Sequence, residues 1–408
     1  MIPRGADIVL VRHRELGTKS ARVQGRMEAQ LERNLEAMLD LRKISGSVTR
    51  ERGRLFIHTS EDAIDDATDA AAATFGVASA SPAISIPPTL DAITSTLARL
   101  APDVYPAGTF AVRARRAGKR SAHPFSSNDI EFDGGAAIWE AVESTFPPEV
   151  DLDDPDVTFF VECRQERAYV FFASRDGPGG FPLGAQGRVV SLISGGIDSP
   201  VAAWEIMRRG CEIVPVYFDF EAYGGPDHVA RAESSVRQLA TFAPGADMTL
   251  YRAPIGEAVE TMVEHVHRTR MLTLRRLMFA VAAAIATDVD AHGLVTGESL
   301  GQKSSQTGPN LAVTSNIVEL PIYRPLLTRD KQDIISQAKR IGTYEEATIN
   351  AGCNRVAPDY PETNAREDDV VSAEPPDFFE RVDQILDRTE AVVVSPTTEP
   401  PVAMTPTD

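Results

Sequence analysis

The sequence predicts an α/β protein of several domains, the last large one built on a parallel sheet. Three observations predict this class. A chain of 408 residues allows roughly two to four domains of ordinary size. Strand-like apolar runs alternate with helical patterns over most of its length, and from residue 188 onward the order strand, helix, strand is that of a βαβ unit. A stretch rich in Gly and Pro at 176–187 separates this part from what precedes it.

The first predicted domain covers residues 1–60 and has a small α+β pattern. Residues 7–12 and 54–59 are short apolar, β-branched runs typical of strands. Between them, residues 23–41 carry Leu and Met at helical spacing. We expect strand, helix and strand in this order.

The second predicted domain covers residues 61–175 and is also α+β. It opens with an acidic, Ala-rich helix at 61–74, followed by a strand-like stretch near 81–86. A helix at 89–100, a strand at 109–115 and a helix near 126–146 come next. Residues 157–163 and 167–173 predict a hairpin.

The third predicted domain covers residues 176–362. Residues 188–193 and 212–220 are continuous apolar runs on either side of a helix at 199–209, as in buried parallel strands. A long helix at 270–286 precedes another buried strand near residue 295. Residues 363–408 are rich in Pro, Thr, Glu and Asp and predict an acidic, disordered tail, despite one amphipathic patch at 378–386.

Composition narrows the class of protein. Hydrophobic residues make up 43% and charged residues 25% of the chain, the balance of a folded, soluble protein. No window reaches the roughly 18 uncharged apolar residues of a membrane span, so no membrane partner is expected. Charged residues interrupt the first segment, which fits neither a secretory signal nor a transit peptide, and a cytoplasmic location is expected. Three cysteines are too few for a disulfide framework or a four-cysteine metal site.

The net charge indicates the environment rather than the partner. The sum 41 − 59 gives −18, which in ordinary salt would argue against a polyanionic ligand. Only six of the 41 basic residues are Lys, and acidic residues are spread along the whole chain. This pattern suggests a halophile, where salt screens repulsion between surface charges. Binding sites must therefore be sought in local charge.

The segment at 189–202, V-V-S-L-I-S-G-G-I-D-S-P-V-A, is the most informative one. A strand runs into a Gly-containing loop that opens a helix, so backbone N–H groups and the helix N-terminus converge on one anion site. Gly195 and Gly196 allow close approach of phosphate, and Ser194 and Ser199 offer hydroxyl donors. Asp198 can hold Mg²⁺ against the phosphates. The spacing fits neither a Walker A loop nor G-x-G-x-x-G; the alternative is a plain turn capped by Asp198.

A second polar cluster, T-G-E-S-L-G-Q-K-S-S-Q-T, occupies residues 296–307 directly after a buried strand. It therefore lies at the carboxyl edge of the same predicted sheet, where open α/β sheets bind ligands. Alone, it could be a polar loop. Two such loops on one sheet favour a nucleotide cleft.

In combination, S-G-G-I-D-S-P-V-A, T-G-E-S-L-G-Q-K-S-S-Q-T and R-P-L-L-T-R-D-K-Q-D-I-I resemble the tRNA 4-thiouridine synthase (ThiI) family over roughly residues 5–363. The resemblance is to the short form without a rhodanese domain, and with the composition it suggests a halophilic archaeon as the source. The resemblance implies a ferredoxin-like domain, a THUMP domain and a PP-loop ATP pyrophosphatase domain, in that order. It also implies the reaction: ATP adenylates O4 of the uridine at position eight of tRNA, and sulfur then displaces AMP to leave 4-thiouridine.

The resemblance also assigns residues by position. Those matching ATP-contacting positions, beside the loop residues named above, are Leu192, Ile193, Tyr217, Phe218, Arg275, Gly297 and Gln306. Asp198 matches the essential loop carboxylate, and Lys331 matches a lysine needed for adenylation, where an ammonium can neutralise phosphate charge. The alternative for Lys331 is a solvated lysine at a helix start.

Cys353, in A-G-C-N-R-V-A-P-D-Y-P-E-T, matches the family's sulfur-handling segment, and Arg355 can favour its thiolate. Cys163 and Cys211 are expected to be buried packing residues. Some archaeal members carry a Cys-x2-Cys pair linked to an iron–sulfur cluster, but Met271 and Leu274 stand at those positions. The sulfur source is therefore left open between a persulfide donor, such as a cysteine desulfurase, and sulfide; a homodimer is also left open.

A local basic patch lies inside this acidic chain. It consists of Arg113, Arg115, Arg116, Lys119 and Arg120. As a bare charge run it would be a solvated face, but the THUMP resemblance implies contact with tRNA. Two alternatives to the sulfurtransferase remain: sulfur transfer for the thiazole of thiamine, and a non-catalytic tRNA-binding protein. The intact catalytic set argues against the second.

Overall fold

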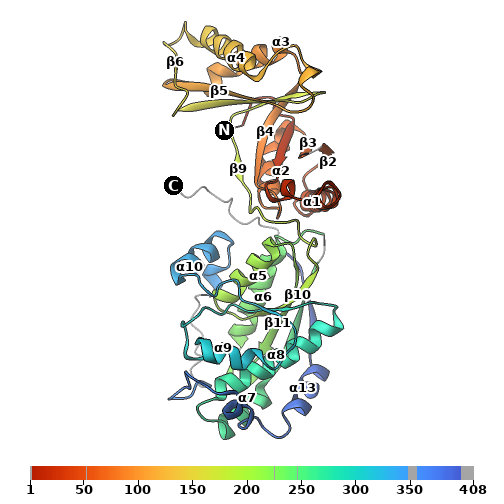
Figure 1. The fold of residues 1–408 in the computed structure, drawn as a ribbon, viewed down its shortest axis with the longest axis vertical. Coiled ribbons are helices and arrows are strands. Elements are labelled where there is room, and N and C mark those ends of the chain that lie inside the picture. The colour runs from red at the N-terminus through yellow and green to blue at the C-terminus, as the bar shows by residue number, and fades with distance from the viewer. Residues whose placement is uncertain (1, 52, 225, 246, 348–355, 397–408) are drawn as a thin grey trace. The chain divides into compact units, whose positions relative to one another are not determined.

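The chain divides between Gly179 and Gly180 into two units, each with its own sheet (Figure 1). The computed structural model describes residues 2–51, 53–224, 226–245, 247–347 and 356–396. The division falls inside the Gly- and Pro-rich segment that the sequence marks as a linker. Gly179 and Gly180 have φ of +67° and +73°, a left-handed backbone that glycine adopts without strain.

The first unit begins with a four-stranded antiparallel arrangement in the order β2-β3-β1-β4. Its strands are β1 (Ile8–Arg12), β2 (Gly46–Glu51), β3 (Arg54–Thr59) and β4 (Ser79–Ile86). Helices α1 (Ala21–Leu41) and α2 (Ile64–Ala72) supply the apolar faces that cover it. Leu31 and Leu35 of α1 are fully buried with Val9 and Ile57, as the helical spacing predicts.

The second half of this unit extends the same sheet in the order β4-β8-β7-β5-β6. Its elements are α3 (Leu90–Val104), β5 (Thr109–Arg116), α4 (Ser127–Val142), β6 (Glu149–Val150), β7 (Val157–Cys163), β8 (Ala168–Phe171) and β9 (Arg175–Asp176). The predicted hairpin is present as the antiparallel pair of β7 and β8.

Strand β4 belongs to both halves, which corrects the boundary predicted at residue 60. Residues 79–83 of β4 pair with β1, whereas residues 84–86 pair with β8. Ile64 and Ala67 of α2 are buried in the first core, so the helix that the sequence assigned to the second domain completes the first one. The three strands and one helix of residues 1–60 would leave an apolar face uncovered, which is why α2 and β4 are needed there.

The second unit contains a six-stranded sheet in the order β14-β13-β10-β11-β12-β15. Strands β10 (Arg188–Ile193), β11 (Glu212–Asp219), β12 (Met248–Pro254), β13 (Leu294–Val295) and β14 (Ile322–Tyr323) are mutually parallel. The chain moves from β10 through β11 to β12 and then returns to the other side of β10 for β13. This reversal makes the carboxyl end of β10 a topological switch point, where a crevice opens in such sheets.

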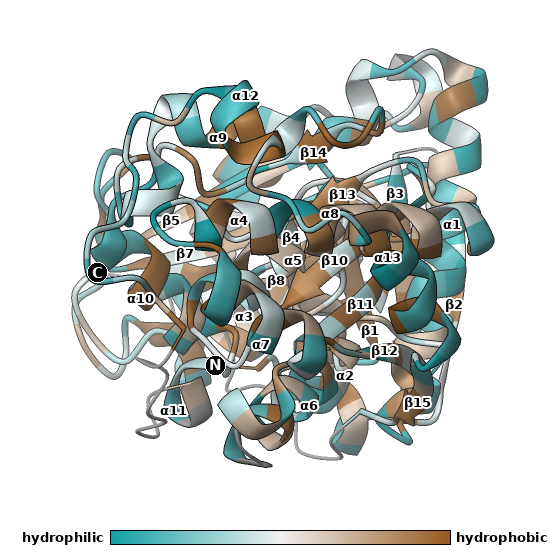
Figure 2. Ribbon diagram, turned by 90° about the horizontal axis from the view of Figure 1, so that it is seen from below, coloured by the Kyte–Doolittle hydropathy of each residue, from teal (hydrophilic) through white to brown (hydrophobic). Residues whose placement is uncertain are grey.

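Helices cover both faces of this sheet, which explains the continuous apolar strands. The right-handed connections place α5 (Asp198–Arg208) and α6 (Pro226–Ala240) on one face. Helices α7 (Gly256–His265) and α8 (Arg270–Asp288) pack with Val190 and Val216 in one core on the other. Figure 2 shows brown apolar strands β10 and β11 among helices that carry teal segments. In the described part of the chain, no helix is long and apolar enough to cross a membrane.

The remaining elements complete this unit. They are α9 (Gly308–Ser315), α10 (Lys331–Arg340), α11 (Tyr344–Ala347), α12 (Glu367–Val371), α13 (Phe378–Asp387) and β15 (Glu390–Val394).

The prediction of a disordered tail from residue 363 is wrong for residues 363–396. Phe378, Val382 and Ile385 of α13 are buried in the core that also holds α8. Strand β15 then pairs antiparallel with β12 and closes that edge of the sheet. The helical spacing of the patch at 378–386 outweighs the polar composition around it, because three apolar side chains on one face are enough to dock a short helix.

Candidate active site

A cavity of about 710 Å³ opens at the carboxyl edge of the second sheet. Its walls come from the loops after β10, β11 and β13, together with α8. All eleven residues predicted to contact ATP line it: Leu192, Ile193, Ser194, Gly195, Gly196, Ser199, Tyr217, Phe218, Arg275, Gly297 and Gln306. Two loops separated by about a hundred residues thus meet at one site, as expected for a switch point.

The loop after β10 is braced by its own serines. The Ser194 N–H donates to Ser199 Oγ at 2.8 Å, and the two hydroxyl oxygens are 3.0 Å apart. The Gly196 N–H donates to Ser194 Oγ at 3.3 Å. Both hydroxyls, which the sequence offers as phosphate donors, therefore also hold the loop in shape ahead of helix α5.

Two glycines are required by close approach of other elements. A Cβ on Gly195 would lie 3.0 Å from Cβ of Arg231 on α6, so this glycine makes room for the helix. A Cβ on Gly297 would lie 2.7 Å from the backbone N of Ser199 and 2.8 Å from the carbonyl carbon of Asp198. Gly297 therefore lets the loop after β13 touch the first turn of α5.

Asp198 and Lys331 form an ion pair beside this loop. Lys331 Nζ is 2.5 Å from Asp198 Oδ1, and the side chains are 42% and 22% exposed. Asp198 is the first residue of α5 and Lys331 the first of α10, each preceded by a residue without a side-chain cap. A lysine at a helix N-terminus is disfavoured by the helix dipole, and the carboxylate opposite it offsets this. Asp198 is not the cap of α5, since the N-cap residue is Ile197 and no side chain caps the helix.

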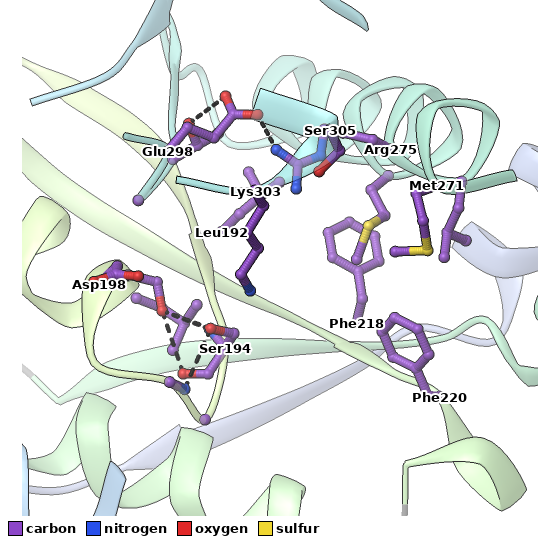
Figure 3. A pocket seen from close by; sticks show the side chains of 18 of the residues that line it. Leu192, Ser194, Asp198, Phe218, Phe220, Met271, Arg275, Glu298, Lys303 and Ser305 are labelled. Atoms are coloured by element: carbon purple, nitrogen blue, oxygen red, sulfur yellow. Dashed lines mark hydrogen bonds and ion pairs between the residues drawn. The ribbon is translucent and has the colours of Figure 1, made fainter. Parts of the chain in front are cut away.

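Glu298 organises the opposite wall (Figure 3). It is 3% exposed, pairs with Arg275 and with Arg324 at 2.6 Å, and accepts from the Thr296 hydroxyl at 2.9 Å. Burial, reinforced by the charge of Arg324, lowers the pKa of Arg275 to about 10, so its guanidinium stays protonated at neutral pH. Glu298 lies within the predicted motif, but only the structure reveals that it fixes Arg275.

The far end of the cavity is apolar, and of the four residues described next the sequence predicted only Phe218 as a binding residue. Phe218, Phe220, Met271 and Met278 line it, and Figure 3 places Phe218, Phe220 and Met271 away from Ser194 and Asp198. Flat apolar walls beside a polar loop suit a heterocycle joined to phosphates. Met271, noted in the sequence only as a missing cysteine, thus has a position of its own in the site.

Cys353 lies outside the described residues. Val356, three residues later, lines the cavity, and its carbonyl accepts from Arg270 Nη1 at 3.1 Å. Cys163 and Cys211 are buried, and burial raises the pKa of both thiols. Neither is thereby suited to act as a thiolate, in agreement with the packing role expected for them.

The predicted basic patch is on β5 and the turn after it. Arg113, Arg115 and Lys119 are exposed. Arg113 donates to the Leu152 carbonyl, and Arg116 donates to the Phe125 carbonyl and lies 5.8 Å from the centre of its ring. Arg116 thus helps hold the turn in place. For Arg120 the structure gives only the backbone, at the start of a 3-10 turn (Arg120–Ala122).

A phosphate-type loop at the switch point of a parallel sheet, preceded by two linked α+β domains, defines the class of PP-loop ATP pyrophosphatases joined to an RNA-binding module. Residues 8–81 match the ThiI ferredoxin-like domain, 88–173 the THUMP domain and 184–376 the family described as Thiamine biosynthesis protein (ThiI). The chain belongs to the ThiI family of tRNA sulfurtransferases, which confirms the predicted fold class.

Related proteins that match nearly the whole chain support this family assignment. A protein of Halobacterium salinarum named "Probable tRNA sulfurtransferase" is 52% identical over 380 residues, covering 93% of this chain and 96% of its own length. One of the same name from Methanosarcina acetivorans is 41% identical over 372 residues, covering 90% and 89%. A solved structure described as a 4-thiouridine synthetase–RNA complex with bound ATP superposes with a TM-score of 0.84 at 27% identity, covering 96% of this chain and 100% of that one.

Proposed function

We propose that this chain is an ATP-dependent tRNA uridine 4-sulfurtransferase that acts in the cytoplasm on the uridine at position eight. The observation that carries the proposal is the Asp198–Lys331 pair at the braced loop, where Asp198 lines a cavity whose other end is apolar. Membership in the tRNA sulfurtransferase family and the likeness to an ATP-bound synthetase–RNA complex support the same reaction.

ATP would lie with its base against Phe218 and Phe220 and its phosphates at the loop before α5. The donors there are backbone N–H groups, the N-terminus of an 11-residue helix and the Lys331 ammonium. These groups complement negative charge, and Gly297 lets the loop after β13 approach them closely.

In the first half-reaction, O4 of the uridine attacks the α-phosphorus of ATP, and the proton on N3 of the base is released to solvent. The bond from the α-phosphorus to the bridging oxygen breaks, and its electron pair leaves with pyrophosphate. Lys331 is placed to offset this growing charge because it already lies 2.5 Å from Asp198 at the same loop.

Mg²⁺ is the metal that such a reaction implies, and Asp198 is the described residue that fits it. One carboxylate together with phosphate oxygens is an ordinary Mg²⁺ environment. When bound, the ion would supply further neutralisation of phosphate charge. The carboxylate would then share its interactions between the ion and Lys331.

In the second half-reaction, the terminal sulfur of a persulfide attacks C4 of the adenylated uridine, and AMP leaves with the bonding pair of the C4–O bond. A second thiol then attacks the remaining S–S bond, which releases 4-thiouridine and leaves a disulfide; sulfide would need no such step. Cys353 is the residue we propose for sulfur handling. It precedes cavity-lining Val356 by three residues, and three residues of chain span at most about 11 Å. The sulfur itself would come from a persulfide donor, such as a cysteine desulfurase, or from sulfide.

The test is transfer of label from α-³²P-ATP to tRNA by Asp198→Asn, with Asp288→Asn as control. Asp288 is an exposed carboxylate at the end of α8. We expect Asp198→Asn to lose transfer by at least about 100-fold while retaining tRNA binding, and the control to match the unaltered protein. Full transfer by Asp198→Asn contradicts the assignment. If the unaltered protein binds tRNA but transfers no label, the non-catalytic alternative stands.

A further inference from the structure

Lys303 occupies the cavity and belongs to none of the roles above. It lies in the loop after β13, with extended backbone angles of φ −135° and ψ 159°, just before a 3-10 turn (Ser304–Gln306). The loop is held by the Gln306 N–H, which donates to the Lys303 carbonyl at 2.8 Å, and by the Gly301 N–H, which donates to the Gln306 carbonyl at 2.9 Å. The base of the Lys303 side chain is therefore fixed.

The side chain extends across the cavity toward the phosphate loop. Figure 3 shows its ammonium on the side of Ser194 and Asp198, away from Phe218 and Phe220. Lys303 comes from the β13 side of the switch point, whereas the loop comes from β10. The ammonium thus faces the loop from the opposite wall.

The Lys303 ammonium differs from the neighbouring cations because it has no partner among the described residues. Lys331 is paired with Asp198, and Arg275 with Glu298. Arg231 donates to the Ala347 carbonyl. For Lys303, no ion pair or side-chain hydrogen bond exists among the residues that the structure describes, and the side chain is exposed to the cavity.

Building on the proposed function, we propose that Lys303 binds the pyrophosphate part of ATP and closes the anion site opposite the phosphate loop. An unpaired ammonium gains a charge-assisted contact without giving up an existing one. Since the electron pair of the broken bond moves onto pyrophosphate during adenylation, this contact strengthens as the reaction proceeds. Lys303 therefore acts on both ATP binding and the rate of adenylation.

The experiment compares Lys303→Met and Lys303→Arg with Lys339→Met, an exposed lysine on α10 that removes the same charge elsewhere. Dissociation constants for ATP, pyrophosphate and AMP are measured by calorimetry in the same salt, alongside label transfer to tRNA. We expect Lys303→Met to weaken ATP and pyrophosphate about 10- to 100-fold and AMP less than twofold. Lys303→Arg should restore most of the loss, and Lys339→Met should change nothing.

Two results would overturn the proposal. One is a Lys303→Met protein whose ATP and pyrophosphate affinities equal those of Lys339→Met. The other is an equal loss for AMP, which would place the ammonium at the α-phosphate. Failure of the proposed function is distinguishable, because ATP and pyrophosphate binding can be measured even when no label reaches tRNA.

Discussion

Replacing Gly297 by Ala adds one methyl group at the contact between the two loops of the site. Its Cβ would lie 2.7 Å from the Ser199 N, 2.8 Å from the Asp198 carbonyl carbon and 2.9 Å from the Ser199 Cα. All three are backbone atoms of the first turn of α5, which cannot rotate away as a flexible side chain can. The helix N-terminus and the phosphate loop must therefore shift.

The expected loss of activity in Gly297→Ala follows from the energetic cost of this overpacking. Inserting a methyl group into a tight contact typically costs about 1–3 kcal/mol. When the transition state of adenylation loses this much stabilisation, kcat/KM for label transfer drops by about 5- to 150-fold. The control is Gly308→Ala at the start of α9, where a Cβ would meet nothing within 4 Å.

Label transfer from α-³²P-ATP to tRNA is measured for both variants, with thermal unfolding alongside. The loss of transfer should be confined to Gly297→Ala. Equal kcat/KM values for the two variants would refute the view that this close contact sets the geometry of the phosphate loop.

Three further predictions concern other parts of the chain. Replacing Arg115 and Lys119 together by Ala should weaken tRNA binding and lower the slope of log K against log salt by about 1.4–1.8, because two phosphate contacts are lost. Phe378→Ala should destabilise the second unit by about 3–5 kcal/mol in thermal or urea unfolding, because the ring is 3% exposed in the core. Cys353→Ser should still adenylate tRNA but yield no 4-thiouridine with a persulfide donor in nucleoside mass spectrometry, because a hydroxyl cannot carry persulfide sulfur.

Two of these predictions have a contrasting variant in the same chain. Phe379→Ala removes a ring that is 66% exposed and should cost little; equal losses at both positions would argue against docking of α13. Cys211→Ser should retain thiolation, and normal thiolation by Cys353→Ser would mean that sulfur reaches uridine by another route. If the salt slope of the Arg115 and Lys119 double variant is unchanged, these two residues do not contact tRNA phosphates.

Local patterns determined most of the second unit and its site. The strand, loop and helix at 188–208 follow from a β-branched apolar run, two glycines and a helical pattern, each of which acts within a few residues. The meeting of the two loops at one edge of the sheet followed as well, since parallel strands bring their carboxyl ends together, whereas the individual lining residues followed from the family resemblance.

Only the tertiary structure decided which side chains are already paired. The Asp198–Lys331 contact joins residues 133 positions apart, and Glu298 meets both Arg275 and Arg324. The sequence identifies most of these residues, but it does not tell which cations are ion-paired. Lys303 differs from Lys331 and Arg275 only through distances between loops, which the sequence does not give. The close approach of Arg231 on α6 to Gly195 also depends on tertiary packing, because the two residues belong to different segments of the chain.

The domain boundary and the tail were decided by packing across long separations. Strand β4 pairs with β1 and with β8 along its length, so no break in composition marks the point where one half of the sheet ends. In the tail, composition argued for disorder while three apolar side chains at helical spacing argued for a docked helix. Composition is an average over all residues of a segment, whereas docking of a helix depends only on the residues of one face. Strand β15 is ordered for a second reason: it pairs with the edge strand β12.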